Sequence, residues 1–143
     1  MNKVVKFGGS SLASAKQFKK VKDIIMADKS RRYVIPSAPG KRTTNDEKVT
    51  DLLYACYSAA SEGRSYKKIF DAITSRYEQI ITGLDLNVNL DFEFKTIEEN
   101  FLAKKGRDYA ASRGEYLNGI IMAAYLGYEF IDAADVICFD ADG

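Results

Sequence analysis

A short strand that ends in two glycines constrains the fold of this 143-residue chain more than any other feature. Residues 3–7 form an apolar run in which Val4 and Val5 are β-branched, and Gly8 and Gly9 follow the run directly. An apolar run bounded by glycine is typical of a buried strand that ends in a tight turn. We therefore predict that the chain begins with a strand of a sheet.

After these glycines the hydrophobic period changes from that of a strand to that of a helix. Apolar residues recur at three- and four-residue spacing, with lysines between them, at Ala15, Phe18, Val21, Ile24 and Ile25. This pattern is typical of an amphipathic helix packed on a sheet, and Ser10 or Ser11 is its expected N-cap. Residues 32–37 are predicted to form a second strand. Together these elements predict a βαβ unit with parallel strands.

The middle of the chain is expected to be helical. After an exposed loop at 39–47, helical periodicity returns in four segments, at residues 48–63, 65–82, 94–105 and 108–126. The last residues, 129–143, return to short apolar runs that are predicted to be strand-like. This alternation of strands with a long helical middle predicts an α/β sandwich.

Charge and composition exclude several function classes. The chain has 21 Lys and Arg against 20 Asp and Glu, so it lacks the basic field that is typical of nucleic-acid binding. It contains no histidine, the side chain used most often in acid–base catalysis and in zinc binding. Any anion site must therefore be local, and any chemistry must proceed without imidazole.

The cysteines and the hydropathy pattern indicate a reducing compartment. Cys56 and Cys138 are the only cysteines, and both lie in apolar segments. We expect two reduced thiols buried in the core rather than a disulfide. No segment approaches the apolar length of a membrane span, and the N-terminus does not follow the signal-peptide pattern. We therefore expect a cytoplasmic protein without a membrane partner.

Lys6, Gly8 and Gly9 form a candidate anion site. Glycines between a strand and a helix let the backbone approach a ligand, and free N–H groups of the first helical turn can bind an anion. Lys6 shares a strand face with Gly8, and its ammonium group can bind phosphate as a compact charge. The alternative is a lysine that extends into solvent beside an ordinary tight turn. The spacing alone leaves both interpretations open.

Two familiar nucleotide motifs are excluded. The stretch PGKRT invites comparison with a P-loop, but Ile35 stands where the first glycine belongs and Arg42 where the Ser or Thr belongs. The dinucleotide motif G-x-G-x-x-G fails because Gly8 and Gly9 are adjacent and no third glycine follows. Phosphate would have to be held in another way.

Three parts of the sequence together resemble the aspartokinases. They are VVKFGGSSLAS at residues 4–14, VIPSAPG followed by KVTDLL at residues 34–53, and SRGEYLNGIIMAAYLG at residues 112–127. Their order and spacing also match, and the resemblance spans essentially all of the chain. It implies the amino-acid kinase fold, a three-layer αβα sandwich with a mostly parallel sheet.

On the nucleotide side, the resemblance implies that Lys6 is catalytic and neutralises charge on the transferring phosphoryl group. The backbone after it would donate N–H groups to the phosphates of ATP. Mg²⁺ would be bound through these phosphates, and no protein metal site is assigned. The residues assigned to ATP and phosphate binding are Lys6, Phe7, Gly8, Gly9 and Ser10.

On the substrate side, the resemblance implies phosphorylation of the L-aspartate side-chain carboxylate to aspartyl phosphate, which begins lysine, methionine and threonine biosynthesis. Ser37 and Thr50 match positions that line the aspartate and phosphoryl pocket, and Glu115 matches the acid that receives the α-ammonium group. Each has a structural alternative, as a turn residue, a polar helix position and an acid near a helix start. Arg113 is expected to be structural, as an ion-pair partner of a nearby acid.

This chemistry agrees with the composition. The attacking carboxylate is already ionised at neutral pH, so it needs no general base and the lack of histidine is no obstacle. Phosphoryl transfer depends on positioning and on charge stabilisation by lysine, N–H groups and Mg²⁺. The expected partners are therefore L-aspartate and ATP.

Aspartokinases also contain segments that this sequence does not match. These are the Gly-Arg-Gly-Gly-Ser-Asp motif of the nucleotide-binding half and the ACT regulatory domains. We therefore expect residues 1–143 to be the N-terminal, substrate-side portion of an amino-acid kinase domain. Such a portion should lack kinase activity alone and should expose an apolar face where its final strand loses packing partners. The full-length protein is expected to be a homo-oligomer.

Two alternatives to the aspartate reaction stay open. One is another amino-acid kinase, acting on glutamate or acetylglutamate, although a blocked amine would have no use for Glu115. The other is a non-catalytic module that binds small anions through the glycine turn.

Overall fold

The computed structural model describes residues 1–142 and begins with the predicted βαβ unit. Strands β1 (Lys3–Phe7) and β2 (Arg31–Pro36) are parallel, with Lys6 opposite Ile35 and Phe7 opposite Pro36. A 3₁₀ turn, η1 (Gly9–Leu12), and helix α1 (Ala15–Met26) connect them. The α/β fold class is confirmed.

The expected N-cap of α1 is wrong by three or four residues. Ser10 and Ser11 lie inside η1, so the α-helix begins only after this turn. Ser14 caps α1 instead, and its Oγ accepts a hydrogen bond from the Gln17 N–H at 3.4 Å. The backbone around Ser10 therefore forms a separate short turn and is not part of α1.

The two faces of the sheet have different surroundings. One face, made by Val5, Phe7 and Val34, packs against the hydrophobic core. The other carries Lys6 and three large side chains that are at least half exposed, Val4, Tyr33 and Ile35. Residues 1–142 thus form a sheet with helices on one face only. An apolar face is exposed on β1 and β2, whereas the expected one lay on a final strand that does not form in residues 128–142.

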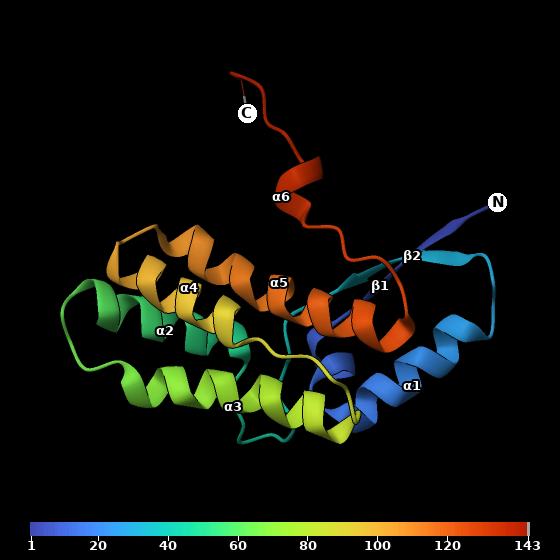
Figure 1. The fold of residues 1–143 in the computed structure, drawn as a ribbon, viewed down its shortest axis with the longest axis horizontal. Helices are drawn as coiled ribbons and strands as arrows, with labels where there is room; N and C mark the ends of the chain where they lie inside the picture. Colours follow the sequence, from blue (N-terminus) through green and yellow to red (C-terminus); the bar gives the residue numbers. More distant parts are fainter. Residues whose placement is uncertain (143) are drawn as a thin grey trace.

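Four helices form the layer beside the sheet. They are α2 (Val49–Ser61), α3 (Lys67–Gly83), α4 (Asp91–Leu102) and α5 (Arg107–Leu126). Helix α2 packs against each of the other three, and α5 also contacts β2 (Figure 1). The predicted helical middle is confirmed, and α5 ends as expected at Gly127, whose φ of 70° favours glycine.

The core joins these helices to α1 through aromatic and aliphatic side chains. The largest of its fully buried residues include Phe18, Tyr77, Phe101, Leu117 and Ile121. Phe101 packs edge-on against the Tyr57 ring, with centroids 5.5 Å apart. Because these side chains come from α1, α2, α3, α4 and α5, one core holds all the long helices in place.

The prediction for the cysteines is half right. Cys56 is fully buried, and burial raises the pKa of its thiol to about 12, so it stays protonated at neutral pH. Cys138 is exposed, which contradicts the expected core position. It lies after α5, in a segment that does not reach the core.

The predicted strand-like segment at the end of the chain is also wrong. Residues 128–142 contain the short helix α6 (Ala133–Val136) and no strand. The Phe130 ring still packs against Tyr116 of α5, with centroids 5.6 Å apart, but the later residues extend away from the helical layer, and Phe139 is 81% exposed (Figure 1). An apolar run becomes a strand only beside a hydrogen-bonding neighbour, and the described chain places none there.

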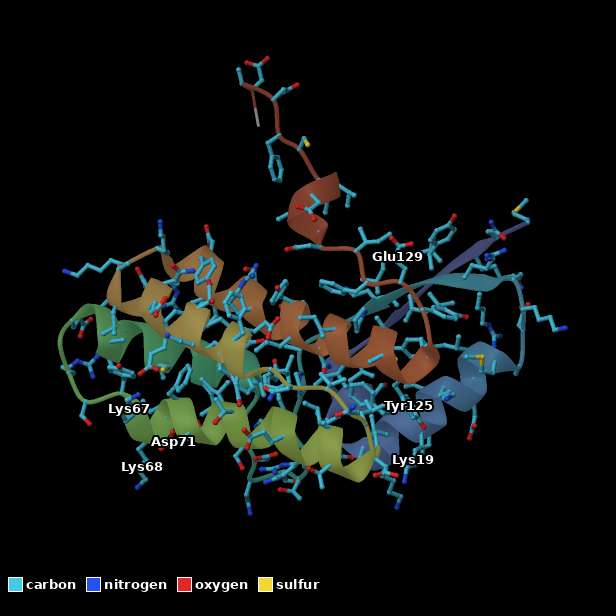
Figure 2. The ribbon with its side chains drawn as sticks, viewed as in Figure 1. Lys19, Lys67, Lys68, Asp71, Tyr125 and Glu129 are labelled. Carbon is cyan, nitrogen blue, oxygen red and sulfur yellow. The ribbon has the colours of Figure 1, made fainter. Side chains whose placement is uncertain are left out.

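The outer faces of the helices are charged. Lys19 of α1 and Lys68 of α3 extend away from the protein, as Figure 2 shows, and Asp71 of α3 is also exposed. Lys67 forms an ion pair with Glu98 of α4. Over residues 1–142, no helix has both the length and the apolar character needed to cross a bilayer.

Arg76 of α3 connects the loop after β2 to the helical layer. Its side chain is 4% exposed and donates to the carbonyl oxygens of Gly40, Glu47 and Ala13 at 2.6, 2.9 and 3.5 Å. Asp46 lies 3.4 Å from the guanidinium group. Burial lowers the pKa of Arg76, so these acceptors are what keep its charge in the interior. One side chain therefore fixes three separate backbone segments.

Replacing Arg76 with alanine should lower the free energy of unfolding by about 3–5 kcal/mol, because buried carbonyl groups and Asp46 lose their donor. Lysine should not restore stability, since one ammonium group cannot reproduce the several N–H donors that the planar guanidinium group holds in fixed directions. Urea unfolding followed by circular dichroism measures both effects. Arg64→Ala is the matched control, because Arg64 pairs with Glu62 in solvent and should contribute less than about 1 kcal/mol. Equal losses in the two alanine variants would contradict this role of Arg76.

Candidate functional site

The candidate site forms where the turn after β1 meets the loop after β2. The Ser37 N–H donates to the Phe7 carbonyl at 3.2 Å, and the Gly40 N–H donates to the Gly9 carbonyl at 2.8 Å. These bonds continue the pairing of the two strands beyond their ends. They bring the predicted phosphate residues Phe7 and Gly9 next to the predicted substrate residue Ser37.

This contact requires glycine on both sides. A Cβ atom on Gly40 would lie 2.6 Å from the Gly9 carbonyl carbon and 2.7 Å from the Ser10 nitrogen. A Cβ atom on Gly9 would lie 3.0 Å from the Ala38 oxygen. Gly8 has no such restriction, because its Cβ would meet no atom within 4 Å. Gly9 is therefore needed for the approach of two backbones, while Gly8 leaves open space.

The open space lies beside backbone N–H groups and Lys6. Gly9 and Ser10 begin η1, so their N–H groups have no acceptor within that turn. Lys6 lies on the exposed face of β1 and makes no side-chain hydrogen bond or ion pair within the described residues. These groups are free to meet an anion, and the ordinary alternative of a solvated lysine fits the same geometry.

The backbone of residues 37–40 is almost fully hydrogen-bonded. The Pro39 carbonyl accepts from the Val49 N–H at 3.1 Å, and the Gly40 carbonyl accepts from Arg76. The first of these bonds attaches the start of α2 to the loop. Thr50, the next residue of α2, is half-buried there, and its side chain makes no hydrogen bond to residues 1–142.

Helix α5 packs against the loop after β2 and contributes two side chains to the site. The Glu115 Oε1 atom accepts from the Ala38 N–H at 3.4 Å, and Asn118 Nδ2 donates to the Ser37 carbonyl at 2.8 Å. Gly114 permits this approach, because its Cβ would lie 2.7 Å from the Ala38 Cβ. The acid predicted from the SRGE segment is thus beside Ser37 and the loop.

Tyr77 of α3 binds this part of α5 from within the core. Its hydroxyl group donates to the Gly114 carbonyl at 2.9 Å, and burial raises its pKa well above the usual value. The phenol therefore stays protonated and keeps its role as a donor. A buried hydrogen bond from α3 thus fixes the turn of α5 that carries Glu115.

Arg113 has a different partner from the one predicted. Its guanidinium group lies 4.8 Å from the Tyr109 ring and 4.3 Å from the Tyr116 ring, and it also donates to Ser112 Oγ. No acid pairs with it in residues 1–142. The expected ion pair is therefore wrong, because stacking on two aromatic rings takes its place.

Comparison with known proteins identifies the family of this chain. The amino acid kinase family profile matches residues 1–143. The chain belongs to the amino acid kinase family. The resemblance noted in the sequence is therefore confirmed at the level of the family, along with its α/β fold.

Three known proteins show which amino acid kinases are similar. The chain is 38% identical to aspartokinase 3 of Bacillus subtilis over 97% of its own length and 32% of that protein. It superimposes on the crystal structure of Clostridium acetobutylicum aspartate kinase with a TM-score of 0.93 and 51% identity, covering 98% of this chain and 32% of that one. Escherichia coli aspartokinase III, solved in complex with aspartate and ADP, shares the fold at TM-score 0.69 and 23% identity, over 89% and 29% of the two chains. The chain thus spans about a third of each relative.

Several residues that organise the candidate site were not predicted from the sequence. Gly40, Arg76 and Asn118 organise the loop as much as the residues that were predicted. Asn118 could have been found, because it is a polar residue on the otherwise apolar face of α5 that carries Leu117 and Ile121. Arg76 and Gly40 could not, because their partners lie 29 or more positions away in the sequence.

The described residues of this chain do not form a metal site of their own. Within residues 1–142, no group of three or more His, Cys, Asp or Glu side chains is arranged to hold a metal ion. The charges that the site does present are the Lys6 ammonium group and the Glu115 carboxylate.

The glycine contact gives a direct test of the site geometry. Gly40→Ala should lower the free energy of unfolding by about 2–3 kcal/mol, because the new methyl group would overlap backbone atoms that cannot move aside. Gly8→Ala is the matched control and should leave stability unchanged or raise it by up to about 1 kcal/mol. Thermal unfolding of the two variants measures the difference. Equal melting temperatures would show that the two backbones are not in contact.

Proposed function

We propose that residues 1–143 form the N-terminal, substrate-side portion of an aspartate kinase catalytic domain. The reaction is ATP-dependent phosphorylation of the L-aspartate side-chain carboxylate to aspartyl phosphate. The observation that carries this proposal is the loop at residues 37–40. It joins the glycine turn after β1, through Gly9, to the carboxylate of Glu115 on α5.

The glycine turn supplies the phosphate side of the site. Gly8, Gly9 and Ser10 donate backbone N–H groups to the phosphates of ATP, together with the backbone next to Phe7. Lys6 neutralises charge on the transferring phosphoryl group, because a compact ammonium group stabilises charge that develops during transfer. This proposal is supported by the exposure of Lys6 and by the open space beside Gly8.

The loop after β2 and helix α5 supply the substrate side. Glu115 accepts the α-ammonium group of L-aspartate, and Ser37 and Thr50 line the pocket for its carboxylate. The exposure of Glu115 supports this assignment, since the carboxylate can meet a ligand from solvent. Its bond to Ala38 is long at 3.4 Å, so an ammonium group can replace it at low cost.

The reaction requires no general base from this chain. A carboxylate substrate is ionised at neutral pH and attacks the phosphoryl group directly. Mg²⁺ is bound through the ATP phosphates and reduces their negative charge. The contribution of residues 1–143 is to position the amino acid and to stabilise the transferring group.

The names of the relatives support the choice of aspartate. The similar proteins from Bacillus and Clostridium are aspartokinases, and the Escherichia protein binds aspartate and ADP. We assign the reaction to the start of lysine, methionine and threonine biosynthesis in the cytoplasm, and the full-length protein to a homo-oligomer. The nucleotide-binding half and the ACT regulatory domains are assigned to sequence outside residues 1–143.

Ligand binding distinguishes this function from its alternatives. L-Aspartate should release or absorb heat on titration into the purified chain, whereas succinate and N-acetyl-L-glutamate should not, because both lack a free ammonium group. Glu115→Gln should weaken aspartate binding at least about tenfold, since a charge-assisted hydrogen bond is lost. Asp108→Asn, an exposed acid on the same helix, is the matched control and should bind normally.

Three results of this calorimetry would reject the aspartate assignment. Stronger binding of L-glutamate or N-acetyl-L-glutamate would indicate another amino-acid kinase. A response to phosphate without any response to aspartate would indicate a small-anion-binding module. Unchanged aspartate affinity in Glu115→Gln would show that the amino acid binds elsewhere.

The isolated chain should not phosphorylate aspartate. The segments assigned to the adenosine side of ATP lie outside residues 1–143, so the γ-phosphate is not held in line for attack. Trapping aspartyl phosphate with hydroxylamine measures the activity, and aspartokinase 3 of Bacillus subtilis serves as the positive control. ATP-dependent hydroxamate formation by the purified 143-residue chain would contradict this expectation.

A further inference from the structure

A single peptide group of the site is held on both of its polar atoms by helix α5. The peptide bond between Ser37 and Ala38 presents its carbonyl oxygen to Asn118 Nδ2, at 2.8 Å, and its N–H to Glu115 Oε1, at 3.4 Å. Glu115 and Asn118 are three residues apart in the helix, so they lie on one face. The orientation of this peptide is therefore set by two side chains with different properties.

Asn118 occupies a position where a polar side chain destabilises the fold. It is fully buried, with 0% of its surface exposed, and its Oδ1 atom has no hydrogen-bond partner in residues 1–142. An unpaired buried acceptor is destabilising, whereas leucine would fill a similar volume without this cost. Among residues 1–142, the only hydrogen bond that its side chain makes is the one to the Ser37 carbonyl. This bond is therefore the gain that offsets the cost.

Glu115 holds the same peptide less firmly. Its side chain is exposed, and its distance to the Ala38 nitrogen is at the long end for a hydrogen bond. A ligand with an ammonium group would form a shorter, charge-assisted bond with this carboxylate. When Glu115 turns to such a ligand, the peptide keeps one anchor on α5, and this anchor is Asn118.

We propose that Asn118 is a positioning residue that holds the Ser37–Ala38 peptide while Glu115 exchanges the Ala38 N–H for the ammonium group of an amino-acid substrate. The proposal rests on the function proposed above for Glu115. The Asn118 bond stops the peptide from rotating when its second bond is released, so the wall of the substrate pocket keeps one shape before and after binding. Substrate binding then costs one long hydrogen bond instead of the ordering of a loop.

The proposal predicts a larger effect on binding than on folding. In the free chain the peptide has both bonds, whereas in the complex it has only the Asn118 bond. Removing the Asn118 bond should therefore destabilise the complex more than the free chain. Asn118→Leu removes the donor and also removes the unpaired Oδ1 atom, so the fold should be retained. L-Aspartate should bind about five- to tenfold more weakly to this variant. Met122→Leu, one turn further along the buried face, is the matched control and should bind as the wild type does.

Nuclear magnetic resonance separates positioning from a merely structural role. In the wild-type chain, one Asn118 side-chain amide proton should be protected from exchange with and without L-aspartate, while the backbone amide of Ala38 should shift on binding. In ligand-free Asn118→Leu, the Ala38 amide should exchange faster than in Met122→Leu. If Asn118→Leu does not fold, Asn118→Ser takes its place, and the wild-type side-chain signal remains a test by itself.

The outcomes distinguish this proposal from the proposed function. Wild-type affinity and unchanged Ala38 exchange in Asn118→Leu would overturn the positioning role while leaving the function intact. Loss of Asn118 protection when aspartate binds would also overturn it. No aspartate binding by the wild type would reject the proposed function, and Ala38 exchange in the ligand-free variants would then decide whether Asn118 holds the peptide.

Discussion

The close contact between Gly9 and Gly40 is the constraint on which the rest of the site depends. Two backbone segments meet there without intervening side chains, so the turn after β1 and the loop after β2 become one surface. Arg76 fixes the loop from the buried side, and α2 begins where the Pro39 carbonyl accepts its first N–H. The hydrophobic core holds the helical layer, while these backbone contacts and the Arg76 side chain position the turn after β1 and the loop after β2 on it.

Helix α5 adds the acidic group to this surface. Gly114 lets the helix approach Ala38, and the next residue, Glu115, then faces the loop. Asn118 binds the same peptide from the buried side of the helix. An exposed carboxylate and a buried amide thus bind one peptide group. In our proposal, Asn118 keeps this peptide in place while Glu115 exchanges its bond for a charged ligand.

Local patterns in the sequence predicted the elements but not all of their ends or partners. The glycines after residues 3–7 and the helical periods of the middle segments depend on neighbouring residues, so they can be recognised in the sequence. The N-cap moved to Ser14 because the chain first makes a 3₁₀ turn, which has no strong signature. The final apolar run formed no strand, because a strand depends on a partner that its own sequence does not specify.

The candidate site shows the same division. Lys6, Gly9 and Glu115 were recognised from motifs, whereas the roles of Gly40 and Asn118 depend on contacts between distant segments.

A crystal structure of the chain with L-aspartate and a non-hydrolysable ATP analogue tests the central claim most directly. The account predicts the amino-acid ammonium group within hydrogen-bond distance of Glu115, with phosphate oxygens facing the amides of residues 8–10. An aspartate molecule bound away from the loop at residues 37–40 would contradict it.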